Sequence, residues 1–154
     1  MTIKSFDKNN LVVLLDPPAS QVGANSSWVQ PFADSKGADR AVFMLVTGIV
    51  GTNDVVLALY QAQDSGGTGA KVITGATVTA ALGTTGKIGT VEIGPGALDN
   101  DPDSDGNSTF SWVQARVTAA SAELWTLIYI RHNLRYPGAH TQDATYLTPV
   151  TVYD

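Results

Sequence analysis

The stretch FSWVQARVTAASAELWTLIYIR, residues 110–131, decides the fold, because the character of its side chains changes at every second position. Successive side chains of a β-strand point to opposite faces, so a period of two predicts strands rather than helices. Residues 110–118 divide into one face with Ser111, Val113, Ala115 and Val117 and another with Phe110, Trp112, Gln114 and Arg116. We predict that the first face belongs to the core and that the second is a contact surface.

Residues 122–131 form a second predicted strand, which we expect to pair with the first as a hairpin across the small-residue turn Ala119-Ala120-Ser121. One of its faces carries Leu124, Thr126, Ile128 and Ile130, and the other carries Glu123, Trp125, Leu127, Tyr129 and Arg131. Apolar residues dominate on both faces, which indicates a strand that is covered on both sides.

Similar short segments, rich in Val, Ile, Thr and aromatic residues, recur along the chain between clusters of Gly, Asn, Asp and Pro. Further strands are expected at residues 11–15, 27–32, 40–46, 55–63, 70–73, 77–82 and 87–93. This pattern is typical of an all-β fold, an antiparallel sandwich or barrel. Residues 1–10 are predicted to form an N-terminal arm, residues 11–133 the β-sandwich domain, and residues 134–154 a C-terminal arm or one more edge strand.

The composition and charge argue against several classes of partner. The 154 residues carry 9 basic and 14 acidic side chains, a formal net charge of −5, without a Lys/Arg cluster that could neutralise phosphates. We therefore expect no nucleic-acid partner and no membrane partner. Charged residues make up only 15% of the chain, against about 25% in typical domains, which favours extensive protein contacts. Because there is no cysteine, the core must hold the fold without disulfides.

The apolar runs of the chain are short. Residues 1–10 are polar, and the runs at residues 11–15 and 41–50 fall well below the roughly 18 residues of a membrane span. The N-terminal run is also too short for the apolar part of a secretory signal. We therefore expect a protein that is made in the cytoplasm.

An acidic loop over residues 99–107 places Asp101, Asp103 and Asp105 at alternate positions before a glycine, as a calcium-binding loop does. Ca²⁺ prefers several hard oxygen ligands, which this spacing would supply. However, Trp112 stands where such a loop needs a bidentate glutamate, and a predicted strand stands where a helix should follow. We predict a solvated hairpin loop and no metal site, with Ca²⁺ binding by the three aspartates as the weaker alternative.

Three short motifs resemble catalytic or binding sequences but lack the required context. The D-S-G-G sequence at residues 64–67 is the one that surrounds the nucleophile of chymotrypsin-like proteases, in which the histidine comes first, yet His132 and His140 both follow it. We predict a Gly-rich β-turn for this quartet instead. Residues 83–87 fit a hairpin turn better than a phosphate-binding loop, because neither Ser/Thr nor a helix pattern follows their lysine. The spacing of the histidines does not match a zinc site. We predict that the chain is not an enzyme and needs no cofactor.

The aromatic residues leave one alternative of a different class. Rigid amphipathic aromatic side chains can stack on sugar rings, as they do in a carbohydrate-binding module. The candidates are Trp28, Phe32, Trp112 and Trp125. Core packing is the commoner fate of such residues, and the few charged and amide residues around them form no obvious hydrogen-bonding cluster. Carbohydrate binding therefore stays an alternative.

Three stretches within residues 55–138 carry a family resemblance: VLALYQAQDSGGTGAKVITGATVTA, KIGTVEIGPGALD and FSWVQARVTAASAELWTLIYIRHNLRYPG. They resemble the capsid decoration, or cement, proteins of tailed bacteriophages. Such proteins commonly show a strand that ends in a Q-x-S/Q-D-x-G turn, a segment around tGAt, and a yvRarVT strand with an apolar hairpin partner and a basic tail. Residues 61–66, 74–77 and 113–118 occupy those places, followed by Arg131, Arg135 and Tyr136. The acidic loop departs from the pattern.

The resemblance implies a β-sandwich or jelly-roll-like subunit, often a homotrimer, that sits on the outer capsid surface of the virion and bridges neighbouring coat subunits. Its partners would be the major capsid protein and other copies of the chain, and it would be made in the host cytoplasm. The residues expected to make these contacts are Lys4, Phe6, Phe110, Trp112, Gln114, Arg116, Arg135 and Tyr136. A head-tail or tail component of a phage, which would form rings or tubes, is the alternative within the virion.

Overall fold

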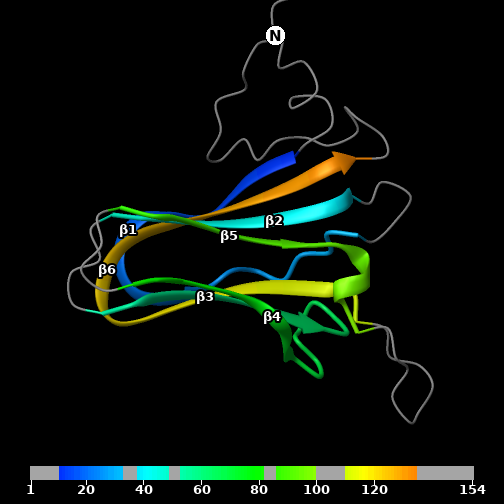
Figure 1. The fold of residues 1–154 in the computed structure, drawn as a ribbon. Coiled ribbons are helices and arrows are strands. Elements are labelled where there is room, and N and C mark those ends of the chain that lie inside the picture. The colour runs from blue at the N-terminus through cyan, green and yellow to red at the C-terminus, as the bar shows by residue number, and fades with distance from the viewer. Residues whose placement is uncertain (1–10, 33–37, 49–52, 82–85, 100–109, 135–154) are drawn as a thin grey trace, which may run out of the picture.

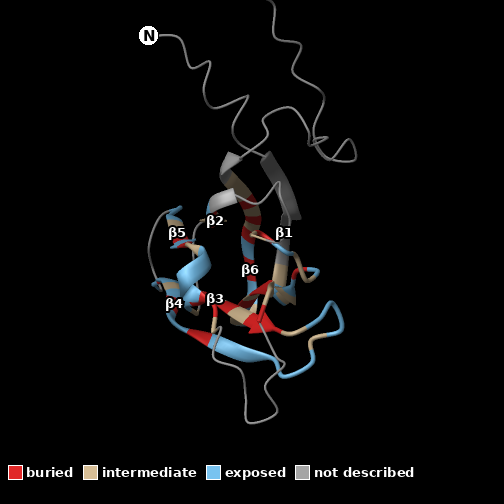
Figure 2. Cartoon of the chain, turned by 90° about the vertical axis from the view of Figure 1, so that its right-hand side faces the viewer, coloured by how far each residue is buried: buried red, intermediate tan, exposed pale blue. Residues whose placement is uncertain are grey.

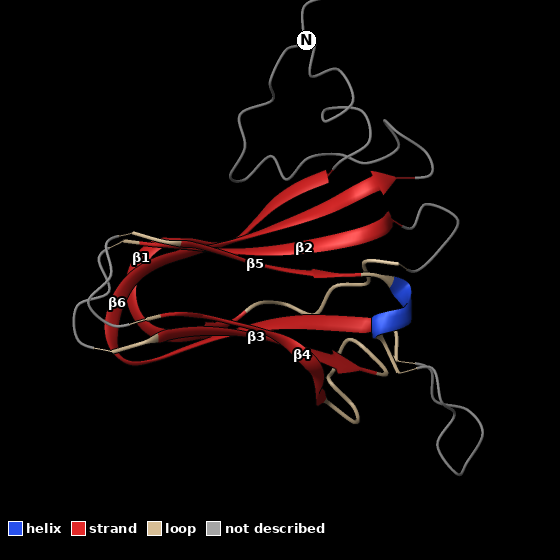
Figure 3. Ribbon diagram, viewed as in Figure 1, coloured by secondary structure: helices blue, strands red, loops and turns tan. Residues whose placement is uncertain are grey.

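The computed structural model describes residues 11–32, 38–48, 53–81, 86–99 and 110–134, and β-strands dominate them (Figure 1, Figure 3). The strands are β1 (Leu11–Asn25), β2 (Ala38–Thr47), β3 (Val55–Ala62), β4 (Lys71–Ala80), β5 (Ile88–Ile93) and β6 (Trp112–Leu134). One short 3-10 helix, η1 (Pro95–Ala97), follows β5. Among the described residues, no helix has the length and apolar character to cross a membrane. The N-terminal arm predicted at residues 1–10 lies outside the described residues, as do residues 135–154 of the C-terminal arm predicted at residues 134–154, while Leu134 ends β6.

The strands form one antiparallel sheet with the order β4-β3-β6-β2-β5, and β1 also pairs with β6. The long strand β6 belongs to two layers, because its residues 112–119 pair with β3 and its residues 125–134 pair with β2. Between these segments β6 bends, so that β3 and β4 face β2 and β5 across the core (Figure 1). We call the two layers the β3 layer and the β2 layer. β1 follows β6 round the bend and pairs with both of its halves.

The fold is therefore an antiparallel β-sandwich that nearly closes into a barrel, which confirms the predicted fold class. The two edge strands of the sheet, β4 of the β3 layer and β5 of the β2 layer, also come close to each other. A Cβ atom on Gly89 of β5 would lie 2.9 Å from Val78 Cγ2 of β4. Since glycine has no Cβ, it allows this close approach between the two edges.

The predicted hairpin between residues 110–118 and 122–131 is wrong. These segments are two parts of the continuous strand β6, and they pair with β3 and β2 rather than with each other. A two-residue hairpin turn needs residues that accept positive φ, usually glycine or asparagine, and Ala119-Ala120-Ser121 contains neither. The backbone therefore stays extended and bends at these small residues.

Three more predicted strands differ from the structure in extent. The segment at residues 27–32 forms only an isolated bridge between Val29 and Val113. The two strands expected between residues 70 and 82 are joined into β4, because Gly75 adopts a φ of 78° inside the strand. Glycine takes this left-handed conformation without steric cost, so the strand changes direction without ending.

β1 is much longer than the strand expected at residues 11–15, because Pro17 and Pro18 do not end it. The register between β1 and β6 shifts twice between Leu14 and Ala19. Proline lacks the N–H that a regular ladder requires, and in sheets it is tolerated at such bulges. The bulged strand can therefore continue along β6.

The core lies between the two layers and is built from alternate positions of the strands (Figure 2). The core face predicted in residues 110–118 is confirmed for Val113, Ala115 and Val117, which are at most 1% exposed. The largest fully buried side chains around them are Phe43, Leu45, Leu57, Leu59, Trp125 and Leu127. Phe43 also stacks on Tyr129, with 4.9 Å between the ring centroids. Burial of these apolar side chains is the main favourable contribution to folding.

The second half of β6 is not covered on both sides within the described chain, which corrects the prediction for residues 122–131. Its inward residues, which include Trp125 and Leu127, are buried. On its outward face Leu124 is 50% exposed, and Ile128 is half-buried. The two apolar faces of this strand therefore have different surroundings: one forms the core, and the other belongs to the molecular surface.

Candidate contact surface

The outer face of the β3 layer carries the described part of the predicted contact face. Arg116 lies over the ring of Tyr60, with its guanidinium carbon 3.8 Å from the ring centroid. Arg116 Nε donates a hydrogen bond to Gln114 Oε1 (2.8 Å), and Gln114 Nε2 donates one to the backbone oxygen of Ser26 (2.8 Å). These contacts hold the guanidinium group in place before any partner binds.

The four described residues of the predicted contact set, which lie on β6 or just before it, fall into two pairs by their burial. Phe110 and Gln114 are only 7% and 8% exposed, so they mainly contact the chain itself. Lys71 Nζ covers Phe110 at 4.4 Å from its ring centroid. Trp112 and Arg116 are half-buried and therefore remain accessible. The accessible contact residues are therefore Trp112 and Arg116, and the buried Gln114 holds Arg116 in place.

Tyr60 is the member of this surface that the sequence reasoning missed. It lies on β3 directly opposite Gln114, and the preceding outward residue, Ala58, lies opposite Arg116. Long side chains at such diagonal positions reach one another across a sheet. The alternation in residues 55–63 marks Tyr60 as outward, but only the register of β3 against β6 brings it to Arg116.

Several predicted site residues lie outside the described residues: Lys4, Phe6, Arg135 and Tyr136 of the contact set, and Asp101, Asp103 and Asp105 of the calcium alternative. Asp99, at the start of the acidic loop, forms an ion pair with Lys71. The Asp99 amide also donates a hydrogen bond to Gln61 Oε1 (2.7 Å). These contacts tie the first residue of the loop to the β3 layer. Within the described part of the chain, no group of three or more His, Cys, Asp or Glu residues is arranged to hold a metal ion.

The D-S-G-G quartet forms the turn that was predicted for it. The Gly67 amide donates a hydrogen bond to the backbone oxygen of Asp64 (3.2 Å). The Asp64 carboxylate accepts hydrogen bonds from the amides of Gly66 (2.9 Å) and Thr68 (3.0 Å) and from the Thr68 hydroxyl (2.6 Å). These donors, with the Thr68 hydroxyl first, hold the pKa of the Asp64 carboxyl below its usual value. Asp64 is therefore the organiser of a surface turn.

We predict that Asp64→Ala lowers the melting temperature at pH 7, because three hydrogen bonds of the turn lose their acceptor. A lowered folded-state pKa stabilises the fold at pH values above the unfolded pKa, about 3.9. That contribution is lost as the pH falls through the folded pKa. The difference in melting temperature between the wild type and Asp64→Ala should therefore be smaller in acid than at pH 7. Asp64→Asn is the control, because it keeps an oxygen acceptor but cannot ionise. Its difference in melting temperature from the wild type should therefore disappear in acid. A difference that stays the same at both pH values would contradict this role of Asp64.

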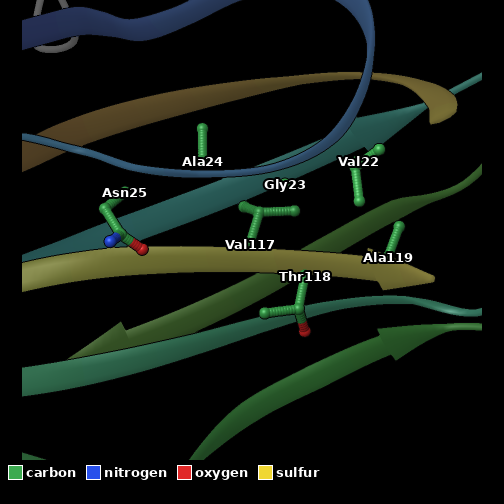
Figure 4. A pocket seen from close by; sticks show the side chains of 7 residues that line it. All are labelled: Val22, Gly23, Ala24, Asn25, Val117, Thr118 and Ala119. Carbon is green, nitrogen blue, oxygen red and sulfur yellow. The ribbon is translucent and has the colours of Figure 1, made fainter. Parts of the chain in front are cut away.

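A shallow hollow of about 370 Å³ lies at the bend of the sandwich, between β1 and β6 (Figure 4). It is lined by Val22, Gly23, Ala24, Asn25, Val117, Thr118 and Ala119. None of these residues has an ionisable side chain, so the hollow offers methyl, amide and hydroxyl groups together with the backbone. Chemistry by acid-base or nucleophilic groups needs a titratable partner, which the lining does not contain.

Trp125 is not available to stack on a sugar ring. It is 1% exposed, and its indole N–H donates a hydrogen bond to the backbone oxygen of Gln21 (3.3 Å). The half-buried Trp28 packs against the turn, where a Cβ atom on Gly67 would lie 3.1 Å from its ring. Trp112 is thus the tryptophan that remains on the outer face of the β3 layer.

No protein-family model matches the sequence, and no curated protein matches it. Among solved structures, a chain of infectious bursal disease virus, strain Gx, is similar with a TM-score of 0.43 at 12% identity, covering 88% of this chain and 35% of that one. A chain from the naturally occurring empty particles of cowpea mosaic virus has a TM-score of 0.43 at 9% identity, covering 89% and 91%. The N-terminal modules of endo-1,4-β-D-xylanase 10B from Clostridium thermocellum, complexed with xylohexaose, reach 0.40 at 15% identity, covering 82% and 26%.

Proposed function

We propose that this chain is a non-enzymatic structural protein of a virus particle, which decorates the outer capsid surface of a tailed bacteriophage and stabilises it by bridging neighbouring coat subunits. The observation that carries the proposal is the outer face of the β3 layer, where Arg116 is held over Tyr60 and Trp112 is half-buried on the same strand as Arg116. Arginine, tyrosine and tryptophan dominate the binding energy of protein interfaces. Side chains that are held in place before binding lose less entropy when the partner arrives.

The architecture and composition also support a binding role on a repeating surface. Because every strand is paired in one continuous sheet, the contact residues stand on a rigid framework rather than on loops. The low share of charged residues, 15%, suits a protein with extensive contacts. On a symmetric lattice, several modest contacts that form at once give an avidity above that of each contact alone. The resemblance in residues 55–138 points to the same role.

The proposal predicts that Arg116→Ala weakens binding to the coat about tenfold or more, because a held arginine at an interface is a typical hot spot. The probe is an empty shell assembled from the major capsid protein that is encoded in the same viral genome. Cosedimentation of the full chain with these shells gives the affinity and the saturating number of copies. Lys87→Ala, which removes an exposed cation from the other layer, is the matched control and should bind like wild type.

Failure of the wild-type chain to bind these shells would remove the decoration role. Large rings or tubes in solution would favour the head-tail or tail alternative. A change in tryptophan fluorescence with a panel of glycans, lost in Trp112→Ala, would favour the carbohydrate-binding module instead.

A further inference from the structure

The outer face of the β2 layer is apolar. Along β2, the buried residues alternate with the half-buried Val42, Met44 and Val46. The register of the strands extends this face on both sides of Met44, to Thr90 on β5 and to Ile128 on β6. The face is most exposed near the bend, where Ile88 on β5 is 67% exposed and Leu124 on β6 is 50% exposed. Strands β5, β2 and β6 together therefore present a largely apolar outer face.

The corresponding face of the β3 layer is different. Its outward row on β4, β3 and β6 consists of Thr77, Ala58 and Arg116, and the next row consists of Thr79, Val56 and Thr118. An antiparallel sheet that faces water usually carries polar residues outward, and threonine and arginine side chains do so in these two rows of the β3 layer. A contiguous apolar surface on a globular protein is typical of an interaction site. Over the described residues, the outer face of the β2 layer is therefore a candidate interaction site.

The charged residues at the margin of this face indicate what kind of partner covers it. The charged residues on the described outward face of β2 and β5 are Arg40 and Glu92, one of each sign, with Arg40 Nε 3.6 Å from Glu92 Oε1. Both side chains are more than half exposed at the margin of the apolar residues. The chain as a whole carries a net charge of −5, so copies repel one another wherever negative surfaces meet. A face with no net charge, an apolar centre and both signs at its margin is complementary to a second copy of itself.

We propose that the outer face of the β2 layer, centred on Met44 and Ile128, is the interface between copies of this chain. Apolar side chains from β2, β5 and β6 of one copy pack against a neighbouring copy, and Arg40 and Glu92 lie at the polar rim. The β3 layer is left free for other partners. This assignment does not depend on the decoration function, because self-association can be measured without any coat protein.

Light scattering coupled to size exclusion on the full chain tests the interface. The wild type should have a molar mass of at least two chains of 16.1 kDa each. Met44→Lys and Ile88→Lys should each lower the molar mass to that of one chain or weaken association at least tenfold. Ile88 is already 67% exposed, so this substitution should leave the fold intact, which circular dichroism checks. The matched control is Val72→Lys, which charges a 47% exposed valine on β4 and should keep the wild-type mass.

Three results would overturn the interface. The first is a wild-type mass of 16.1 kDa over the whole concentration range. The second is a folded Ile88→Lys variant that keeps the wild-type mass. The third is a monomeric wild type whose binding to empty coat shells is lost in Ile88→Lys, which would assign the face to the coat protein. Loss of shell binding in Arg116→Ala with an unchanged molar mass would separate the two surfaces.

Discussion

Trp125→Ala is expected to destabilise the fold by about 3–5 kcal/mol, the usual cost of removing a buried aromatic side chain. Trp125 lies on β6 just after the bend, is 1% exposed, and is the largest of the fully buried side chains. Its loss leaves a cavity beside β1 and β2, which pair with it at Ala19 and Thr47, and removes the hydrogen bond to Gln21. For a domain of this size, the expected fall in melting temperature is roughly 10 °C.

Urea unfolding followed by circular dichroism measures this loss. Trp125→Phe keeps most of the apolar volume and should cost clearly less than the alanine variant. Trp112→Ala, which truncates a half-buried tryptophan on the same strand, should also cost less. A Trp125→Ala variant within about 1 kcal/mol of wild type would mean that the bend is not packed around this side chain.

Gly23→Ala is the second substitution with a large expected effect. A Cβ atom at residue 23 would lie 2.7 Å from the backbone oxygen of Val117 on β6. The obstructing atom belongs to the backbone, so it cannot move aside without displacing β6 from β1. We expect a loss of about 1–3 kcal/mol, as for other insertions of a methyl group into filled space.

The control for Gly23→Ala is Gly96→Ala in η1, where no atom lies within 4 Å of the added Cβ. That variant should unfold within about 0.5 kcal/mol of wild type, as most surface substitutions do. If the two alanine variants lose the same stability, the close approach of β1 to β6 at the bend does not constrain residue 23. Because Gly23 lines the hollow at the bend, its variant also shows whether the shape of that region affects binding to coat shells.

The two proposed surfaces lie on opposite outer faces of one sandwich. Arg116 is held over Tyr60 on the β3 layer, where Trp112 is half-buried, and Met44 and Ile128 are at the centre of the apolar outer face of the β2 layer. β6 contributes to both faces, because it bends from one layer into the other. A protein with one surface for its own copies and another for a coat could bridge neighbouring coat subunits, so the substitutions above should separate the two activities.

The sequence alone predicts the class of fold and one face of the core. Side chains of a strand alternate with a period of two, so the strand pattern and the inward positions of Val113, Ala115 and Val117 can be derived from neighbouring residues only. The same local alternation identifies Trp112 and Arg116 as outward. The turn at Asp64 could also be predicted from the sequence, because the residues that form it are adjacent in the chain.

Only the tertiary structure decides how the strands are paired and therefore what each outward face meets. The alternation in residues 110–131 is the same for a hairpin and for a single bent strand, and the choice depends on β3, β2 and β1, which pair with β6 from distant parts of the sequence. That pairing brings Tyr60 to Arg116, buries Gln114 against Ser26, and leaves Ile128 on an apolar outer face. Register between distant strands follows from the packing of the whole sheet rather than from local pattern, so these contacts could not be derived from the sequence.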